Sequence, residues 1–348
     1  MSQRVRAGAV VVIAGLSTCW LAFSLLVWAF GESPHAVARS LLEGTWGMPY
    51  GIGQVLYKAT PLLLTGVAVD LALRAGLFNV GAEGQLAIAG LAVATVGAHL
   101  PPATPSAFAL PAVFAVAAAA GATWAWLPAA LRARFGAHEV ISTIMMNRIV
   151  DAAIGLALAR GLALPGTTRT PDILSAARLP RLEALGIAAL HGSAVSLALP
   201  ASLVVTAIAS VWLAKTRVGR EVVLVGLSPA ACAAEGIPVA RRLGAALVLS
   251  GAIAGLASIG PVIGYKGYYE SGLGSGAGFG GIAVALLGRG SPIGMPLAAM
   301  VLGTLDQGGL VVNGRVPMEI MTILQGVIIV AVALADARTR HAVARAGA

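Results

Sequence analysis

Long apolar stretches separated by short polar segments make up most of this chain. About 20 apolar residues in a helix are enough to cross the hydrocarbon core of a bilayer. The pattern therefore predicts an all-α, polytopic membrane helical bundle of about ten transmembrane helices, in a single transmembrane domain over residues 1–348. The predicted spans are 8–30, 54–73, 84–99, 107–128, 140–160, 194–214, 243–263, 276–288, 293–312 and 317–335. Eight or nine spans also fit the pattern.

Two stretches of this pattern are too short and too rich in glycine for ordinary spans, namely Ala75–Gly90 and Ser275–Met295. Each has a glycine-punctuated entry followed by a helix of small residues, and they occupy corresponding places in the two halves of the chain. Such a pair is typical of broken helices from an internal repeat, which meet near the membrane midplane around a site. We therefore expect a weak internal duplication here.

A basic segment, Lys215–Arg242, interrupts the apolar pattern and carries the signals of a short helix. Ser228 is a suitable N-cap, Pro229 suits the first helical position, and Gly236 suits the end of the helix. Seven residues, 229–235, give roughly 10 Å of helix, which is too short to cross a membrane. This basic island, as we call residues 215–242, therefore predicts a docking element for another protein.

The distribution of Lys and Arg predicts the orientation. Placing Arg4 and Arg6 in the cytoplasm assigns fourteen basic residues to the inside and eight to the outside, with Arg148 left within a span. Cytoplasmic loops carry an excess of Lys and Arg, so both termini are expected in the cytoplasm. The longest external loop is then 161–193, in which LEALGIAAL (182–190) predicts either a short amphipathic helix on the rim, where a soluble partner lands, or a plain connection.

Composition supports the membrane assignment and excludes several functions. The chain is 58% hydrophobic and 11% charged, whereas soluble proteins carry about 25% charged residues. The net charge is +9, but the basic residues do not form a patch interleaved with aromatic residues, as they do on nucleic-acid-binding surfaces. No nucleic acid is therefore expected as a partner. The five histidines lack the spacing of metal ligands, and neither a metal nor a cofactor is expected.

Several polar side chains fall inside predicted spans, where a charge or amide must face protein or water. They are Asn79, Glu83 and Gln85 in the first broken segment, Glu139, Ser142, Thr143 and Asn147 on the fifth span, Asp306 and Gln307 on the ninth, and Gln325 on the tenth. Each one alone is as well explained by hydrogen bonding between helices. As a group they favour a polar passage.

Catalytic motifs are absent from the sequence. Gly276, Gly278 and Gly281 fit a dinucleotide-binding spacing but do not follow a strand, and no nucleotide-binding P-loop occurs. The chain is therefore not expected to be an enzyme, and any ATP hydrolysis must occur on a separate chain. Glu83 and Asp306 leave a proton-coupled secondary carrier open as an alternative.

Five segments carry a family resemblance. They are GLFNVGAEGQ (76–85), HEVISTIMMN (138–147), VGLSPAACAAEGIPVARR (225–242), SGAIAGLAS (250–258) and GFGGIAVALLGRGSPIGM (278–295). With these segments in this order, the chain resembles permease subunits of bacterial ABC importers, in the group of ribose-type and branched-chain amino-acid permeases. Within that group it most resembles the nucleoside type. Permeases for simple sugars or branched-chain amino acids remain the alternatives.

The resemblance implies a multi-pass protein of the bacterial plasma (inner) membrane with a nucleoside-like substrate. It implies three partners: a cytoplasmic ABC ATPase dimer, a second permease subunit, identical or paralogous, and an extracytoplasmic substrate-binding lipoprotein. ATPase coupling is assigned to Glu221, Gly226, Ser228, Ala230, Ala231, Glu235, Gly236 and Arg241, with Glu235 and Arg241 expected to pair. The translocation pathway is assigned to Asn79, Glu83, Gln85, Glu139, Thr143, Asn147, Asp306 and Gln307.

Overall fold

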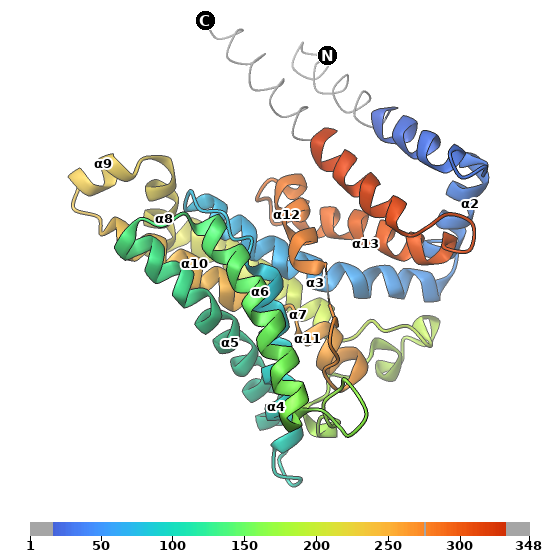
Figure 1. Cartoon of the computed structure of the whole chain (residues 1–348), viewed down its shortest axis with the longest axis horizontal. Helices are drawn as coiled ribbons and strands as arrows, with labels where there is room; N and C mark the ends of the chain where they lie inside the picture. The colour runs from blue at the N-terminus through green and yellow to red at the C-terminus, as the bar shows by residue number, and fades with distance from the viewer. Residues whose placement is uncertain (1–16, 275, 332–348) are drawn as a thin grey trace, which may run out of the picture.

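Residues 17–274 and 276–331 are described by a computed structural model, and within them the regular structure is helical (Figure 1). The labelled helices are α2 Pro34–Thr45, α3 Pro49–Arg74, α4 Ala82–His99, α5 Ser106–Phe135, α6 Glu139–Ala157, α7 Ala198–Lys215, α8 Arg217–Leu227, α9 Pro229–Ala234, α10 Val239–Leu256, α11 Ile259–Pro261, α12 Ala277–Gly288 and α13 Gly294–Val312. Short 3₁₀ or π segments are η1 Leu158–Leu162, η2 Ser175–Ala177, η3 Leu182–Leu185, η4 Ala188–Leu190 and η5 Val262–Lys266. Helices Ser17–Trp28 and Glu319–Ala331 flank this set.

Six helices of the described part are long and apolar enough to cross a membrane, which makes the chain a multi-pass membrane protein. They are Pro49–Arg74, Ser106–Phe135, Glu139–Leu162, Ala198–Lys215, Val239–Lys266 and Gly294–Val312. Three further apolar helices, Ser17–Trp28, α12 and Glu319–Ala331, are shorter than that limit. The predicted count of about ten spans is therefore not confirmed. Parts of the predicted spans 8–30 and 317–335, and the terminal residues whose orientation was predicted, lie outside the described residues.

Helix α3 is the centre of the fold, and it packs against α7, α10, α12 and α13. It is apolar around its whole circumference, as expected for a helix surrounded by others, and its residues from Ala59 to Ala72 are all buried. In Figure 1, α5, α6 and α10 lie together on one side of the molecule and α12 and α13 on the other. Because α3 contacts both groups, a displacement of either group changes the packing around α3.

Glycines bring α5 and α10 into backbone contact. A Cβ atom added to Gly251 of α10 would lie 2.6 Å from the carbonyl oxygen of Gly121 on α5, and a Cβ at Gly255 would overlap the carbonyl oxygen of Ala117. Small residues at such positions allow close helix packing in membranes. The seam formed by Gly121, Gly251 and Gly255 joins α5 to α10.

Two predicted elements need comment. The segment 182–190 does not form one amphipathic helix, because Gly186 adopts a left-handed conformation (φ +92°) and divides it into the 3₁₀ turns η3 and η4. Both glycine-rich segments contain a helix break, at 75–81 before α4 and at Gly276 before α12. The internal repeat itself is not confirmed by this arrangement.

Candidate functional site

Within the basic island, helix α9 forms an exposed projection at one tip of the molecule, while α8 packs against the helix bundle (Figure 1). The Oγ atom of Ser228 accepts a hydrogen bond from the backbone N–H of Ala231 at 3.3 Å, which confirms Ser228 as the N-cap of α9. Glu235 caps the other end, one residue earlier than predicted, and Gly236 follows with φ +76°. Ala230, Ala231, Glu235, Gly236 and Arg241 are all exposed. The predicted docking residues are thus available to another protein.

Glu221 holds this projection to the membrane helices. Its carboxylate accepts hydrogen bonds from the guanidinium groups of Arg217 at 2.8 Å and Arg242 at 2.6 Å. These two bonds lower the pKa of Glu221 below its ordinary value. Among the described residues of the island, no ion pair joins Glu235 to Arg241. The ion pairs of the island are instead made by Glu221 with Arg217 and Arg242, and they link the start of α8 to the start of α10.

Gly226 connects α8 to the end of α3. A Cβ atom at this position would overlap the carbonyl oxygen of Arg74, so only glycine allows the two backbones to approach this closely. Gly76, which has φ +72°, lies against the same glycine from the other chain segment. Gly226 therefore contacts the chain where α3 ends and the break before α4 begins. Its assignment to ATPase coupling stays a prediction.

A buried polar network stabilises that break. The amide of Asn79 donates to Gln85 Oε1 at 2.9 Å and to Ser250 Oγ at 2.8 Å, and Ser250 donates to the carbonyl of Ala68. The amide of Asn147 donates to the carbonyl of Val80 and accepts from the backbone N–H of Gly84, both at 3.0 Å. Side chains of α4, α6 and α10 thereby supply hydrogen-bond partners to the non-helical segment 75–81, whose polar groups lack helical partners.

Glu139 and Thr143 extend this network along α6. Glu139 accepts a hydrogen bond from the backbone N–H of Phe78 at 3.3 Å and lies 3.5 Å from Arg132. Thr143 is fully buried and lies against Gly81. A Cβ atom added to Gly81 would lie 3.1 Å from the Cβ atom of Thr143. The structure thus brings five predicted pathway residues together: Asn79, Gln85, Glu139 and Asn147 hydrogen-bond between segments, and Thr143, whose hydroxyl donates to the carbonyl of Glu139 within α6, packs beside them. Their place on a pathway stays a prediction.

Glu83 has a different environment. Its two carboxylate oxygens accept hydrogen bonds from the backbone N–H groups of Gly276 and Gly278, both at 2.7 Å, at the start of α12. A carboxylate at this end of a helix is favoured by the helix dipole. Glu83 thus links the beginnings of the two broken helices, α4 and α12. It also lines a cavity of about 200 Å³ with Asp151 and Tyr269, and burial raises the pKa of Tyr269 to about 12.

A cavity of about 630 Å³ lies between α3, the start of α12, α13 and the helix Glu319–Ala331. Asp306 lines it and accepts a hydrogen bond from the amide of Gln325 at 2.6 Å. Gln307, the neighbouring predicted residue, is buried outside this lining. Tyr57, Lys58 and Phe279 complete its polar and aromatic wall. The size and mixed lining suit a small organic molecule.

Lys58 and Tyr57 were not predicted as site residues. The predicted span 54–73 placed Lys58 only one turn from its start, and the predicted topology counted it among the external cations. The helix begins at Pro49 instead, so Lys58 lies more than two turns inside α3. Pro49 is a suitable first residue of a helix, and a helix that begins there places Lys58 well inside the span. This signal in the sequence could have identified Lys58 as a site residue.

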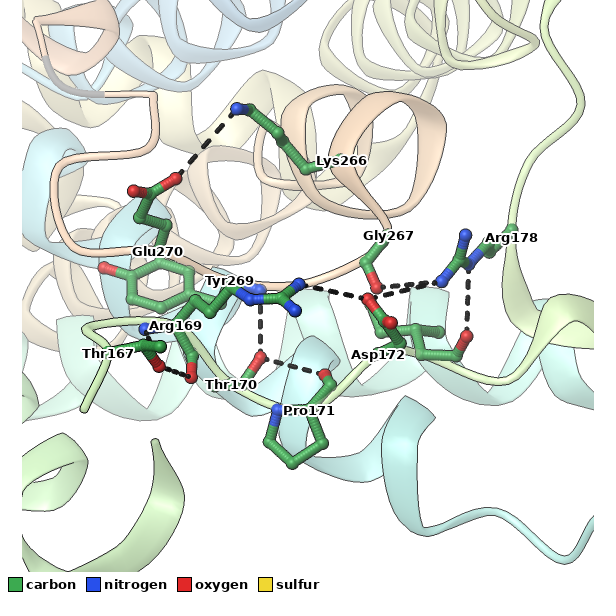
Figure 2. A network of polar contacts seen from close by, with 11 residues as sticks. Thr167, Arg169, Thr170, Pro171, Asp172, Arg178, Lys266, Gly267, Tyr269 and Glu270 are labelled. Atoms are coloured by element: carbon green, nitrogen blue, oxygen red, sulfur yellow. Dashed lines mark hydrogen bonds and ion pairs between the residues drawn. The ribbon is translucent and has the colours of Figure 1, made fainter. Parts of the chain in front are cut away.

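The loop 161–193, which is predicted to be external, is attached to the segment that follows η5 (Figure 2). The backbone N–H of Thr170 donates to the carbonyl of Tyr269, whose own N–H donates to Thr170 Oγ1 at 3.0 Å. Asp172 lies within 3.5 Å of Arg169 and 3.7 Å of Arg178, and Arg178 also donates to the carbonyl of Gly267. The loop residues 169–178 therefore form an ordered cover over 267–270.

Sequence comparison places these features in a family. Residues 51–333 match the family described as the branched-chain amino acid transport system / permease component. No solved structure matches the chain.

Curated relatives extend the match over nearly the whole chain. The chain is 35% identical to the guanosine ABC transporter permease protein NupP of Bacillus subtilis, over 93% of this chain and 91% of that protein. It is 32% identical to the nucleoside ABC transporter permease protein NupB of Lactococcus lactis, over 89% and 86%. It is 34% identical to a glucose ABC transporter permease protein of Haloferax volcanii, over 80% and 75%. The chain therefore belongs to the family of branched-chain amino acid transport system permease components.

Proposed function

We propose that this chain is the permease subunit of an ABC importer for nucleosides, in which it forms the translocation pathway and couples to a separate ATPase. The observation that carries the proposal is the similarity to two nucleoside-type permeases over about nine-tenths of the chain. Such permeases are not enzymes, and the absence of a P-loop from this sequence agrees with hydrolysis on another chain.

Coupling to an ATPase dimer on the cytoplasmic side would use the basic island. The exposed side chains of Ala230 and Ala231 are small enough for α9 to enter a cleft of the ATPase, while Glu235 and Arg241 are free to make polar contacts. Displacement of α9 would pass through α8 to Gly226 and from there to the end of α3. Because α3 is packed on all sides, this contact offers a direct mechanical route to the cavity.

The cavity lined by Asp306 is the candidate substrate site. Nucleosides combine a flat base with a polyhydroxylated ribose, so they need an apolar or aromatic wall and several hydrogen-bonding groups. Phe279 and Tyr57 supply aromatic surface, and Asp306, Gln325 and Lys58 supply acceptors and donors. The remaining predicted pathway residues would then support the walls of this path.

A second permease subunit, identical or paralogous, is supported by two charges on the outer surface of α6. Arg148 and Asp151 lie near the middle of the 24-residue span Glu139–Leu162, yet 81% and 66% of their side-chain surfaces are exposed. A charged residue at the centre of a bilayer costs about 2.5–3.5 kcal/mol or more when it faces lipid. The two side chains pair with each other at 3.9 Å, and Asp151 also lines the cavity beside Glu83. Protein or water must still cover this exposed pair, and a second subunit would do so.

The remaining partner is an extracytoplasmic substrate-binding lipoprotein, which would dock on the side opposite the island. The ordered cover formed by residues 169–178 lies in the external loop of the predicted topology. This orientation places both termini in the cytoplasm of a bacterial cell, with the protein in the plasma membrane. The excess of basic residues on the island side supports it.

Reconstitution with the ATPase and the binding protein tests the proposal. Proteoliposomes should take up radiolabelled guanosine only when ATP is enclosed with the ATPase. Uptake that follows a proton gradient and ignores ATP would instead establish a secondary carrier.

The second candidate function is sugar import, because a glucose permease is 34% identical over 80% of this chain. Competition separates the two substrate classes. Excess unlabelled nucleoside should abolish guanosine uptake, and excess glucose should leave it unchanged. The reverse pattern with labelled glucose would replace nucleosides by simple sugars.

A further inference from the structure

A second cavity, of about 460 Å³, lies where α3, α7 and α8 meet the loop before α13. One end is lined by apolar side chains, among them Val67, Leu213 and Met295, and the other by Arg74 and Arg220. It shares no lining residue with the cavity around Asp306. The proposed transport function does not use it.

The charges of this cavity are not balanced. Arg74 is occupied, because its Nε donates to Asp70 at 2.8 Å and its Nη2 donates to the carbonyl of Gly290 at 2.7 Å. Arg220 is exposed, and its guanidinium has no ion pair or hydrogen bond with any other described residue. Two guanidinium groups and one carboxylate line the cavity, so it carries one excess positive charge. A ligand that completes it must bring one negative charge to Arg220.

The apolar end points to the rest of the ligand. Val67 and Arg74 are seven residues apart on α3, so the apolar wall extends about 10 Å along the helix from the charged end. Arg220 belongs to the short amphipathic helix α8, directly after the membrane span that ends at Lys215. The cavity therefore has its charge at the membrane surface and its apolar wall towards the membrane interior, which is the polarity of a phospholipid molecule.

We propose that this cavity binds an anionic phospholipid, whose phosphate pairs with Arg220 and whose acyl chain lies along Val67, Leu213 and Met295. Basic pockets between membrane helices at the cytoplasmic surface are suited to such headgroups. A lipid in this position contacts α3, α7 and α8 together. The bound lipid would therefore stabilise the contact between α8 and α3. Because its phosphate pairs with Arg220, this contact would depend on the charge of the surrounding lipids.

Native mass spectrometry of the purified full chain tests this binding. The protein is exchanged into detergent with phosphatidylglycerol or phosphatidylcholine, and the bound lipid is counted. We expect one retained phosphatidylglycerol in the unaltered protein. Retention should be about five-fold weaker in Arg220→Gln, because this variant loses one favourable charge near the membrane surface. Lys215→Gln is the matched control, since Lys215 is an exposed basic residue nearby that does not line the cavity. It should retain the lipid as the unaltered protein does.

Several results would overturn the proposal. These are no retained phosphatidylglycerol in the unaltered protein, equal retention in Arg220→Gln, equal loss in Lys215→Gln, or equal retention of phosphatidylcholine. Titration of delipidated protein with inorganic phosphate distinguishes a free anion from a lipid. Binding of phosphate that is as tight as that of phosphatidylglycerol would show that the apolar wall contributes nothing, and would replace the lipid by a free phosphate. None of these readouts depends on transport of a nucleoside.

Discussion

Gly226 of α8 lies against the carbonyl group of Arg74 at the end of α3, with no space between them for a side chain. These residues are far apart in the sequence, and the contact joins the basic island to the central helix of the bundle. A transporter driven from the cytoplasm needs such a rigid contact between its docking element and its membrane helices. In the proposed mechanism, Gly226 would transmit movement from within the protein, while the exposed residues Ala230, Ala231 and Gly236 would contact the ATPase.

Replacement of Gly226 by alanine should break this route. The added methyl group overlaps the Arg74 carbonyl, so α8 must move away, at a cost of about 1–3 kcal/mol typical of overpacking. ATP-dependent uptake should fall about tenfold or more, while the ATPase remains bound. Gly244→Ala is the control, because a Cβ there would meet only Ala133 at 3.9 Å. Normal uptake by Gly226→Ala would remove this contact from the coupling route.

Gly236→Asp should uncouple transport from the outer surface. Gly236 has no neighbouring atom within 4 Å, so the aspartate side chain meets no steric clash. Its φ of +76° adds backbone strain, although aspartate adopts this region more readily than most residues. The new carboxylate would instead meet the ATPase. We expect the protein to reach the membrane at normal levels, and ATP-dependent uptake to be lost in proteoliposomes. A variant that transports normally would show that the end of α9 does not contact the ATPase.

Protonation of Glu221 should loosen the island. Hydrogen bonds from Arg217 and Arg242 lower the pKa of Glu221. A carboxyl whose pKa is lowered in the folded state adds stability above the pKa of the unfolded chain, and this stability is lost as the pH falls through the folded value. Proteolysis within residues 215–242 should therefore accelerate below about pH 4.5, near the ordinary pKa of Glu.

Two variants check this prediction. Glu221→Gln should be cleaved rapidly at neutral pH and should lose the acceleration on acidification. Glu43→Gln removes a matched (i, i+4) pair with Arg39 that is exposed on both sides, and it should behave as the unaltered protein does. Identical pH profiles for the unaltered protein and Glu221→Gln would contradict the role of Glu221.

Asp306→Asn should weaken substrate binding without disturbing the cavity. The asparagine keeps an oxygen that accepts the hydrogen bond of Gln325 but removes the charge. A hydrogen bond to a charged group contributes about 1.5–3 kcal/mol, so the KM for nucleoside uptake should rise roughly 10- to 100-fold. Glu319→Gln, an exposed carboxyl at the start of the same helix as Gln325, should leave KM unchanged. An unchanged KM in Asp306→Asn would place the substrate elsewhere.

Asn79→Leu should destabilise the protein more than it alters transport. The substitution leaves the buried amide of Gln85 without its partner and removes the donor to Ser250 Oγ, and a buried polar group left unsatisfied costs about 1–3 kcal/mol. The thermal unfolding midpoint in detergent should fall clearly, and Gln54→Leu, which removes a bond to the exposed Tyr50, should change it little. Unaltered stability with impaired uptake would show instead that Asn79 belongs to the pathway surface.

Local signals predicted the short helix α9 well, because its cap, its proline and its terminal glycine are all adjacent in the chain. The bond between Glu221 and Arg242 was missed, since it joins residues 21 positions apart on different helices. The buried position of Asn79, Gln85 and Asn147 followed from their place in apolar stretches. Their roles as hydrogen-bond partners of an interrupted backbone depend on which helices surround that break, and the hydrophobic pattern does not contain this information.

The close seam of Gly121, Gly251 and Gly255 also limits how the protein can change shape. Two helices in backbone contact cannot slide or rotate independently, because either motion would drive the next side chain into a carbonyl group. Helices α5 and α10 must then travel as one rigid body. Alternation between two openings would therefore displace α5 and α10 together, and any hinge must lie outside this pair.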